Sequence, residues 1–339
     1  MKTVIVCAML RSTRRGRALA GIAASAALVL TACGGSGNTG AGDEASAGDC
    51  PAAPVDVVVS VDQWGDIVSQ LGGVCTRVTT VVAGSSVDPH DFEPAPSDAV
   101  AFEGAQLVVV NGGHYDEWAT KLAQTSAPDA HLIDAVALST GHSGHEDHGH
   151  EGHDHEGHDH ADEGNPHVWY RPSAVTEVVD AVTAELTALS ADAAGYFADR
   201  HRAFVESMKP YEDTVAAIRA GATGKTYAAA EGAFDDMAAA LGLTNRTPPG
   251  FQVAAANHSE PSPADLDAFL NLLSERGVDV LVYNTQTEGS VPEQIRRAAE
   301  QSGVPVVEVT ETLPSDAGSF QDWQVAQLDS LAEALGVGT

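Results

Sequence analysis

The densest group of metal-ligating side chains in this sequence lies in residues 141–163. Histidines recur there at spacings of two and three, with aspartates and glutamates between them, and Ala161 is the only apolar residue. The histidines are His142, His145, His148, His150, His153, His155, His158 and His160. Imidazole binds zinc, copper and nickel well, so we expect this segment to collect several ions weakly and exchange them quickly. The alternative is a solvated linker that binds metal only as a by-product.

Two further histidines each follow a proline at a turn. His90 stands in Asp88-Pro89-His90-Asp91, after a valine-rich stretch, and His167 stands in Asn165-Pro166-His167, just after the histidine-rich segment. Proline fixes its own φ, so each turn presents its imidazole in a defined direction. The repeated dipeptide predicts that His90 and His167 converge on one cation.

The surrounding elements would have to position these turns. Short β-branched runs alternate with helical patterns, which favours parallel sheets flanked by helices. The expected strands are 55–59, 78–82, 107–111 and 131–134, then, after a restart, 226–230, 245–251, 280–284 and 305–309. The strand-free stretch between the two groups predicts one helix to about residue 186 and a second over 191–220, with a kink at Pro210. The sequence thus predicts two α/β lobes joined by a helical spine, with ligands bound beyond the carboxyl ends of the strands.

The start of the chain has the pattern of an export signal. Four arginines precede a 13-residue apolar run, Ala18 to Leu30, which is too short to span a bilayer as a helix. The following Leu30-Thr31-Ala32-Cys33-Gly34 resembles the lipobox of bacterial lipoproteins, whereas the alternative is a secretory signal with a chance cysteine. We therefore expect a signal peptide over 1–32, a lipid on Cys33 and a flexible tether over 33–53.

Cysteine usage and charge limit the setting further. Cys50 and Cys75 remain after the signal and the lipidated cysteine are set aside, and each precedes an expected strand. If those strands are parallel neighbours, both cysteines lie at one end of the sheet, and we expect a disulfide in an exported protein; the alternative is two unpaired thiols. The net charge of −31 argues against nucleic-acid binding.

Several of these segments together resemble the zinc- and manganese-type solute-binding proteins of bacterial ABC importers. The resemblance covers roughly residues 55 to 337. It is carried by the two Pro-His segments and by Pro96-Ser97-Asp98, Asn111-Gly112-Gly113, Glu117-Trp118, Tyr227–Leu241 and Glu260-Pro261-Ser262-Pro263. It implies two lobes, each with a mainly parallel four-stranded sheet, joined by a long rigid helix, with one ion in the cleft. The expected borders are 54–171, 172–222 and 223–339.

The resemblance also implies a ligand set. The family's first two ligands map onto His90 and His167, and its third onto Glu231. The fourth is often an acid after the strand that corresponds to Val280–Tyr283, where this chain departs from the family pattern and Glu288 is the nearest carboxylate. The alternatives there are Gln286, Asn284, a water molecule and His258. The family has aspartate where this chain has Asn165, so Asp88 is the better candidate for a charged hydrogen-bond partner of a ligand.

The expected function is extracytoplasmic capture of zinc and delivery to an ABC permease with its ATPase subunit, by a monomer held on the membrane through its lipid. Manganese is the alternative ion, and a metal buffer or adhesin without a permease is the alternative role. An exported zinc hydrolase is a further class. The sequence shows no His-x-x-x-His on a helix and no nucleophile–base set, so we expect no enzyme.

Overall fold

The structure, a computed structural model, describes residues 49–84, 90, 92–141, 164–287 and 289–339. All of them belong to the unit Ala45–Thr339. The expected signal peptide, Cys33, most of the tether and the eight histidines of 142–160 lie outside the described residues. The borders expected between the lobes at 54–171, 172–222 and 223–339 stay predictions.

Two four-stranded parallel sheets organise the described chain, one in each lobe. The N-terminal sheet has the order β2-β1-β3-β4 and the C-terminal sheet the order β6-β5-β7-β8, so both lobes share one topology. The strands are β1 Val55–Val61, β2 Thr76–Val82, β3 Leu107–Val110, β4 His131–Asp134, β5 Thr226–Ala229, β6 Thr244–Asn245, β7 Val280–Asn284 and β8 Val306–Val309. The predicted fold class is confirmed.

Helices cover both faces of these sheets. They are α1 Asp62–Gly72, α2 Pro96–Phe102, α3 Glu117–Ser126, α4 Ala135–Ser139, α5 Pro172–Leu189, α6 Ala194–Ser207, α7 Lys209–Gly221, α8 Asp235–Ala240, α9 Pro249–Ala256, α10 Pro263–Ser274, α11 Ser290–Ser302 and α12 Phe320–Leu335. Short 3-10 turns are η1 Gly73–Cys75, η3 Val168–Tyr170, η4 Ala191–Ala193 and η5 Gly232–Phe234.

The continuous valine runs reflect burial on both faces of the N-terminal sheet. Val57 and Val59 point into a core shared with α1 and α5, whereas Val58 points to the other face, where α2 and α3 pack. Strands buried on both sides carry apolar residues at successive positions because neither face meets water. The sheet is therefore fixed from both sides, and the loops at its carboxyl end start from rigid points.

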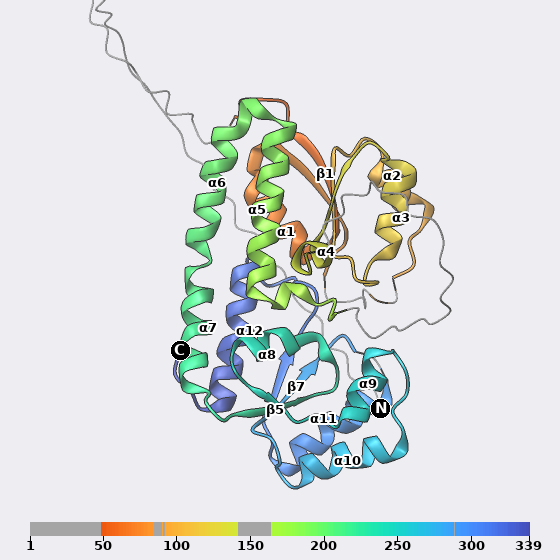
Figure 1. The fold of residues 1–339 in the computed structure, drawn as a ribbon, viewed down its shortest axis with the longest axis vertical. Coiled ribbons are helices and arrows are strands. Elements are labelled where there is room, and N and C mark those ends of the chain that lie inside the picture. The colour runs from red at the N-terminus through yellow and green to blue at the C-terminus, as the bar shows by residue number, and fades with distance from the viewer. Residues whose placement is uncertain (1–48, 85–89, 91, 142–163, 288) are drawn as a thin grey trace, which may run out of the picture. The chain divides into compact units, whose positions relative to one another are not determined.

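The two lobes are joined by α5, α6 and α7, which Figure 1 shows in green. The helix that was expected over 191–220 is interrupted at Met208, between α6 and α7. Pro210 explains the interruption, because it has no N–H to donate to the carbonyl of Glu206. The C-terminal helix α12 packs against α7 and also contacts α1. The expected kink at Pro210 is thus present as a short break.

One expected strand is largely wrong. The stretch 245–251 contributes only Asn245 to β6, and α9 begins at Pro249. Pro248 and Pro249 provide no backbone donor for a strand ladder, and Pro249 suits the first position of a helix. This change places α9 beside the opening of the cleft, where a strand had been expected.

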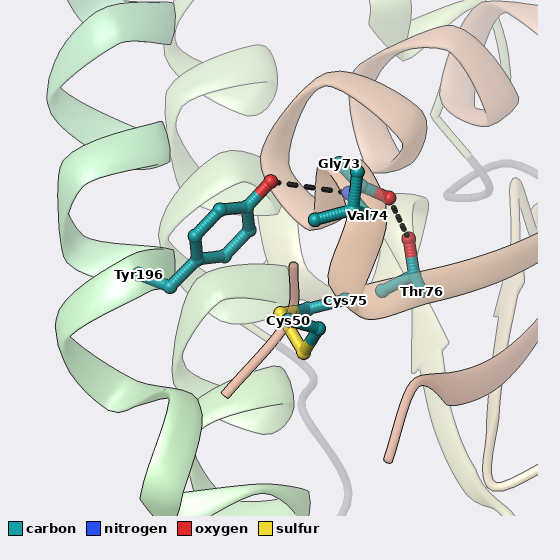
Figure 2. The surroundings of a disulfide bond; sticks show 6 residues. All are labelled: Cys50, Gly73, Val74, Cys75, Thr76 and Tyr196. Atoms are coloured by element: carbon teal, nitrogen blue, oxygen red, sulfur yellow. Dashed lines mark hydrogen bonds between the residues drawn. A yellow bond between two sulfur atoms is a disulfide. The ribbon is translucent and has the colours of Figure 1, made fainter. Parts of the chain in front are cut away.

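A disulfide joins Cys50 to Cys75, as the sequence predicted, with the Cα atoms 5.0 Å apart. The bond ties the segment before β1 to the turn before β2, at the amino end of the two paired strands (Figure 2). Beside it, the backbone N–H of Val74 donates to the hydroxyl of Tyr196 on α6 at 3.1 Å. The disulfide therefore lies at the end of the sheet away from the segment that carries His90.

Candidate metal centre

Four side chains from separate parts of the chain meet between the lobes. His90, His167, Glu231 and Glu311 each offer one ligand atom, and these atoms lie within 4.8 Å of one another. His90 follows β2 and His167 precedes η3, while Glu231 and Glu311 follow β5 and β8. Each lobe supplies two of the four side chains. The three residues that follow strands lie beyond the carboxyl ends of those strands, where ligands bind in open α/β sheets.

The two imidazoles face each other through the same ring atom. Nε2 of His90 lies 3.3 Å from Nε2 of His167. Nδ1 of His167 lies 2.7 Å from the side-chain oxygen of Asn165, which only accepts hydrogen bonds. The proton of a neutral His167 is therefore on Nδ1, and its Nε2 lone pair is directed at the shared space. Asn165 also donates to the carbonyl of Gly232 at 2.9 Å, which links the His167 turn to the C-terminal lobe.

Asn111, the residue after β3, holds the Pro-His turn that carries His167. Its Nδ2 donates to the carbonyl oxygen of Pro166 at 2.8 Å, and its Oδ1 accepts from Nε1 of Trp64 at 3.0 Å. The backbone N–H groups of Asn111 and Gly112 donate to the carboxylate of Asp116 at 2.7 and 2.8 Å. The position of His167 is therefore set by a buried network anchored on the N-terminal sheet.

Aromatic rings form the wall behind the imidazoles. The rings of His90 and Tyr115 meet edge to face with centroids 4.6 Å apart, and Trp169 meets His167 in the same way at 5.2 Å. Both Tyr115 and Trp169 are buried. An apolar wall of this kind limits water access to a metal and lowers the local dielectric constant.

The two carboxylates oppose the imidazoles. Oε1 of Glu231 lies 3.5 Å from Nε2 of His167, and Oε2 of Glu311 lies 3.4 Å from Nε2 of His90. The side chain of Glu311 is 2% exposed and that of Glu231 is 18% exposed. The distances exceed those of ordinary N–H···O hydrogen bonds, so these buried oxygens are poorly satisfied by the imidazoles alone.

Burial acts on both acids, but their neighbours separate them. Burial raises the pKa of Glu231, and the adjacent charge of Glu311 raises it further. Burial also opposes ionisation of Glu311, but the imidazoles of His167 and His90 hold its pKa well below the usual range. Of the two carboxylates, that of Glu311 therefore keeps its charge more readily. A divalent cation between them would offset the repulsion between the charges of Glu231 and Glu311.

Several residues predicted from the sequence have other positions or roles. The side-chain oxygen of Gln286 accepts from the backbone N–H groups of Glu311 and Thr312 at 2.7 and 3.1 Å, so it holds the loop that carries Glu311. His258 lies at the rim, with its ring centroid 5.0 Å from that of His90. Asp88 and Glu288, the expected partner and the expected fourth ligand, lie outside the described residues.

Glu311 is the site residue that sequence reasoning missed, because the fourth ligand was expected one strand earlier. A usable signal was present. Glu231 comes two residues after the end of β5 at Ala229, and Glu311 comes two residues after the end of β8 at Val309. The same spacing from two strands of one parallel sheet brings both acids to one edge.

Three of the four side chains, those of His90, His167 and Glu231, line a cavity of about 640 Å³ between the lobes. Its lining includes His90, His167, Glu231, Asp235 and His258. Residues of α9, among them Phe251 and Gln252, also line the cavity.

Two α/β lobes of one topology, with imidazoles and carboxylates converging between them, define a metal-binding solute-binding protein. The chain belongs to the family described as zinc-uptake complex component A, periplasmic, whose model matches residues 57–334. Members of this family are extracytoplasmic components of metal transport and not enzymes.

Individual relatives agree with this family. The chain is 27% identical over 320 residues to the high-affinity zinc uptake system protein ZnuA of Bacillus subtilis. The alignment covers 93% of this chain and 94% of that protein. It is 23% identical over 189 residues to the manganese-binding lipoprotein MntA of Halalkalibacterium halodurans, which covers 56% of this chain and 55% of that one.

Solved structures share the fold. A crystal structure of ZnuA superposes with a TM-score of 0.62 at 19% identity and covers 84% of this chain and 97% of that one. The manganese-bound periplasmic metal binding protein of Candidatus Liberibacter asiaticus gives a TM-score of 0.64 at 17% identity, with coverage of 83% and 99%.

Proposed function

We propose that this protein binds one zinc ion between its lobes, through His90, His167, Glu231 and Glu311, and delivers it to an ABC permease and its ATPase subunit. The observation that carries the proposal is the spacing of the four donors. Two nitrogens at about 2.0–2.1 Å from a tetrahedral zinc ion lie about 3.3–3.4 Å apart. The two Nε2 atoms are 3.3 Å apart, Oε2 of Glu311 lies 3.4 and 3.5 Å from them, and Oε1 of Glu231 lies 3.5 Å from that of His167. All four ligand atoms lie within 4.8 Å of one another.

The donor set also bears on the identity of the ion. Two carboxylates and two imidazoles would accept manganese as well as zinc, and relatives named for each metal exist. In a site of given donors the intrinsic affinity for zinc exceeds that for manganese. The histidine-rich segment 141–163 adds a preference for zinc, because imidazole is a poor ligand for manganese. Zinc is therefore the ion that we propose, with manganese as the alternative.

We further propose that the protein acts as a monomer, held on the outer face of the membrane by lipid on Cys33. The lipobox-like sequence before Cys33 and the acidic tether after it support this anchoring. None of the helices in the described ranges is long and apolar enough to cross a bilayer. In this arrangement the tether gives the metal-binding unit reach from the membrane to its permease.

A competition titration with a zinc-selective chelator tests the central proposal. The purified full chain should bind one zinc ion tightly and further ions weakly on the histidine-rich segment. His90→Ala or His167→Ala should abolish the tight binding. His201→Ala is the matched control, since His201 pairs with Asp180 on the exposed side of α6. If both cleft variants titrate like the parent, the assignment of the site is wrong.

A further inference from the structure

We propose that Asn284 restricts each glutamate of the cleft to one metal-binding oxygen and thereby sets the preference for zinc over manganese. The inference rests on the proposed function, because it explains the selectivity of that same site. Asn284 is the last residue of β7, is 4% exposed, and stands where the sequence analysis had looked for a metal ligand.

The amide group of Asn284 bridges the two acids. Its Nδ2 donates to Oε2 of Glu231 at 3.1 Å and to Oε1 of Glu311 at 2.7 Å. An amide nitrogen carries two hydrogens, so both are used on the carboxylates. The orientation of the amide is fixed from the other side, because its Oδ1 accepts from the backbone N–H of Gln286 at 3.0 Å.

Each glutamate is consequently divided between two partners. Glu231 directs Oε1 at His167 and gives Oε2 to Asn284, and Glu311 directs Oε2 at the two histidines and gives Oε1 to Asn284. The hydroxyl of Thr287 also donates to Oε2 of Glu231. One oxygen of each acid is thus occupied, and the site offers two nitrogens and two oxygens.

Four donors suit the two candidate ions differently. Closed zinc sites in proteins are almost always four-coordinate and tetrahedral, whereas manganese favours six-coordinate sites rich in oxygen. A carboxylate that accepts a hydrogen bond on one oxygen is a poor bidentate ligand, so Asn284 withholds the additional oxygens that manganese would take. If Asn284 were only a structural amide, its loss would affect both ions alike.

The same position in the other lobe supports a role in arranging the site. Asn111 follows β3, the strand that corresponds to β7 in the shared topology, and its side chain holds the turn before His167. Both strands border the point where the strand order reverses, which is where open α/β sheets bind ligands. One asparagine orients an imidazole, and the other holds the carboxylates.

The test compares zinc and manganese dissociation constants of the full chain and of Asn284→Ala, measured by competition with chelating indicators. We expect zinc affinity to fall about 10- to 100-fold, as for other hydrogen-bond partners of metal ligands. Manganese affinity should stay the same or rise, so the ratio of zinc affinity to manganese affinity should fall by about tenfold or more. Zinc K-edge X-ray absorption should show a higher coordination number in the variant than in the parent.

Asn245→Ala is the matched control. Asn245 ends β6, and its Oδ1 accepts from the backbone N–H of Thr247 at 2.9 Å, just as Oδ1 of Asn284 accepts from that of Gln286. The Nδ2 of Asn245, however, faces Asp235 and neither glutamate of the site. This variant should keep the parent's ratio. Thr287→Val removes the other donor to Glu231 and should narrow the ratio in the same direction.

The outcomes separate the inference from the function on which it rests. If the parent holds no tight zinc, the proposed function fails. Suppose instead that the parent binds zinc tightly and His90→Ala abolishes this binding. If Asn284→Ala then keeps the parent's ratio of zinc to manganese affinity, because both affinities are unchanged or fall equally, the role of Asn284 is refuted. Circular dichroism reports folding of each variant. Should Asn284→Ala not fold, the ratio measured for Asn284→Leu, which keeps the volume and removes both donors, decides, and an unchanged ratio overturns the proposal.

Discussion

Oε2 of Glu311 lies 3.4 Å from Nε2 of His90, although the two residues belong to different lobes. The contact brings a buried carboxylate of the C-terminal lobe against an imidazole of the N-terminal lobe. It makes Glu311 the fourth member of the site and gives the cleft two donors from each side.

Replacing Glu311 by glutamine should weaken zinc binding more than the roughly 10- to 100-fold loss expected for a residue that only supports a ligand. Glutamine keeps the volume but removes the charge that faces both imidazoles. Competition titration measures the change, with Glu308→Gln as control, because Glu308 is exposed on β8 and pairs with Arg296. Should Glu288→Gln cost more than Glu311→Gln, the assignment made from the sequence would stand instead.

Deleting residues 142–163 should remove weak additional ions and slow loading, but leave the tight site intact. The four proposed cleft donors come from elsewhere in the chain, so we expect the segment to act only as an accessory collector of ions. Native mass spectrometry counts the ions, and stopped-flow mixing with zinc measures loading. A variant with the eight histidines replaced by serine separates their effect from that of segment length. Loss of the tight ion on deletion would contradict the accessory role.

Replacing Cys33 by alanine should release the protein from the membrane. The 13-residue apolar run before it is too short to span the bilayer as a helix, so we expect membrane attachment to depend on the proposed lipid. Fractionation of cells together with incorporation of labelled palmitate measures the effect, and Ser36→Ala is the control. Unchanged membrane retention and labelling in the variant would exclude Cys33 as the anchor.

Loss of the disulfide should lower stability without affecting zinc affinity. Cys50 and Cys75 close a loop across 25 positions, for which chain entropy predicts a stabilisation of about 3 kcal/mol. The bond lies at the amino end of β1 and β2, away from the cleft. Thermal unfolding of the parent and of Cys50→Ser/Cys75→Ser measures the difference. A reducing agent should destabilise the parent alone, and a parallel loss of zinc affinity would count against this separation.

Asp116 should make stability depend on pH. Burial raises its pKa from 3.8 to about 6, so the folded protein favours the protonated acid more than the unfolded chain does. Its contribution is therefore largest below the unfolded pKa and is lost as pH rises through about 6. Between about pH 7 and pH 4, the unfolding free energy of the zinc-free parent should gain about 2 kcal/mol relative to Asp116→Asn. A difference that stays constant across this range would contradict the shift.

The sequence by itself determined the two-lobed α/β fold, the disulfide and the convergence of His90 and His167. These follow from local patterns: valine runs without alternation, Pro-His turns and cysteines placed before neighbouring strands. Glu231 was also brought into the cleft, as the resemblance implied. The strand expected over 245–251 does not form, because Pro248 and Pro249 provide no backbone donor for a strand ladder and Pro249 begins a helix.

Only the tertiary structure brings Glu311 beside His90, His167 and Glu231. Asn284 and Glu311 are neighbours because β7 and β8 pair in register, with Asn284 opposite Val309, and the loop after β8 then returns over the end of β7. From the sequence, an acidic residue after any strand is an equal candidate for a ligand, because the sequence does not show which loops fold back over the sheet. Whether a side chain binds the metal or holds another ligand depends on small differences in position, which strand pairing and packing set.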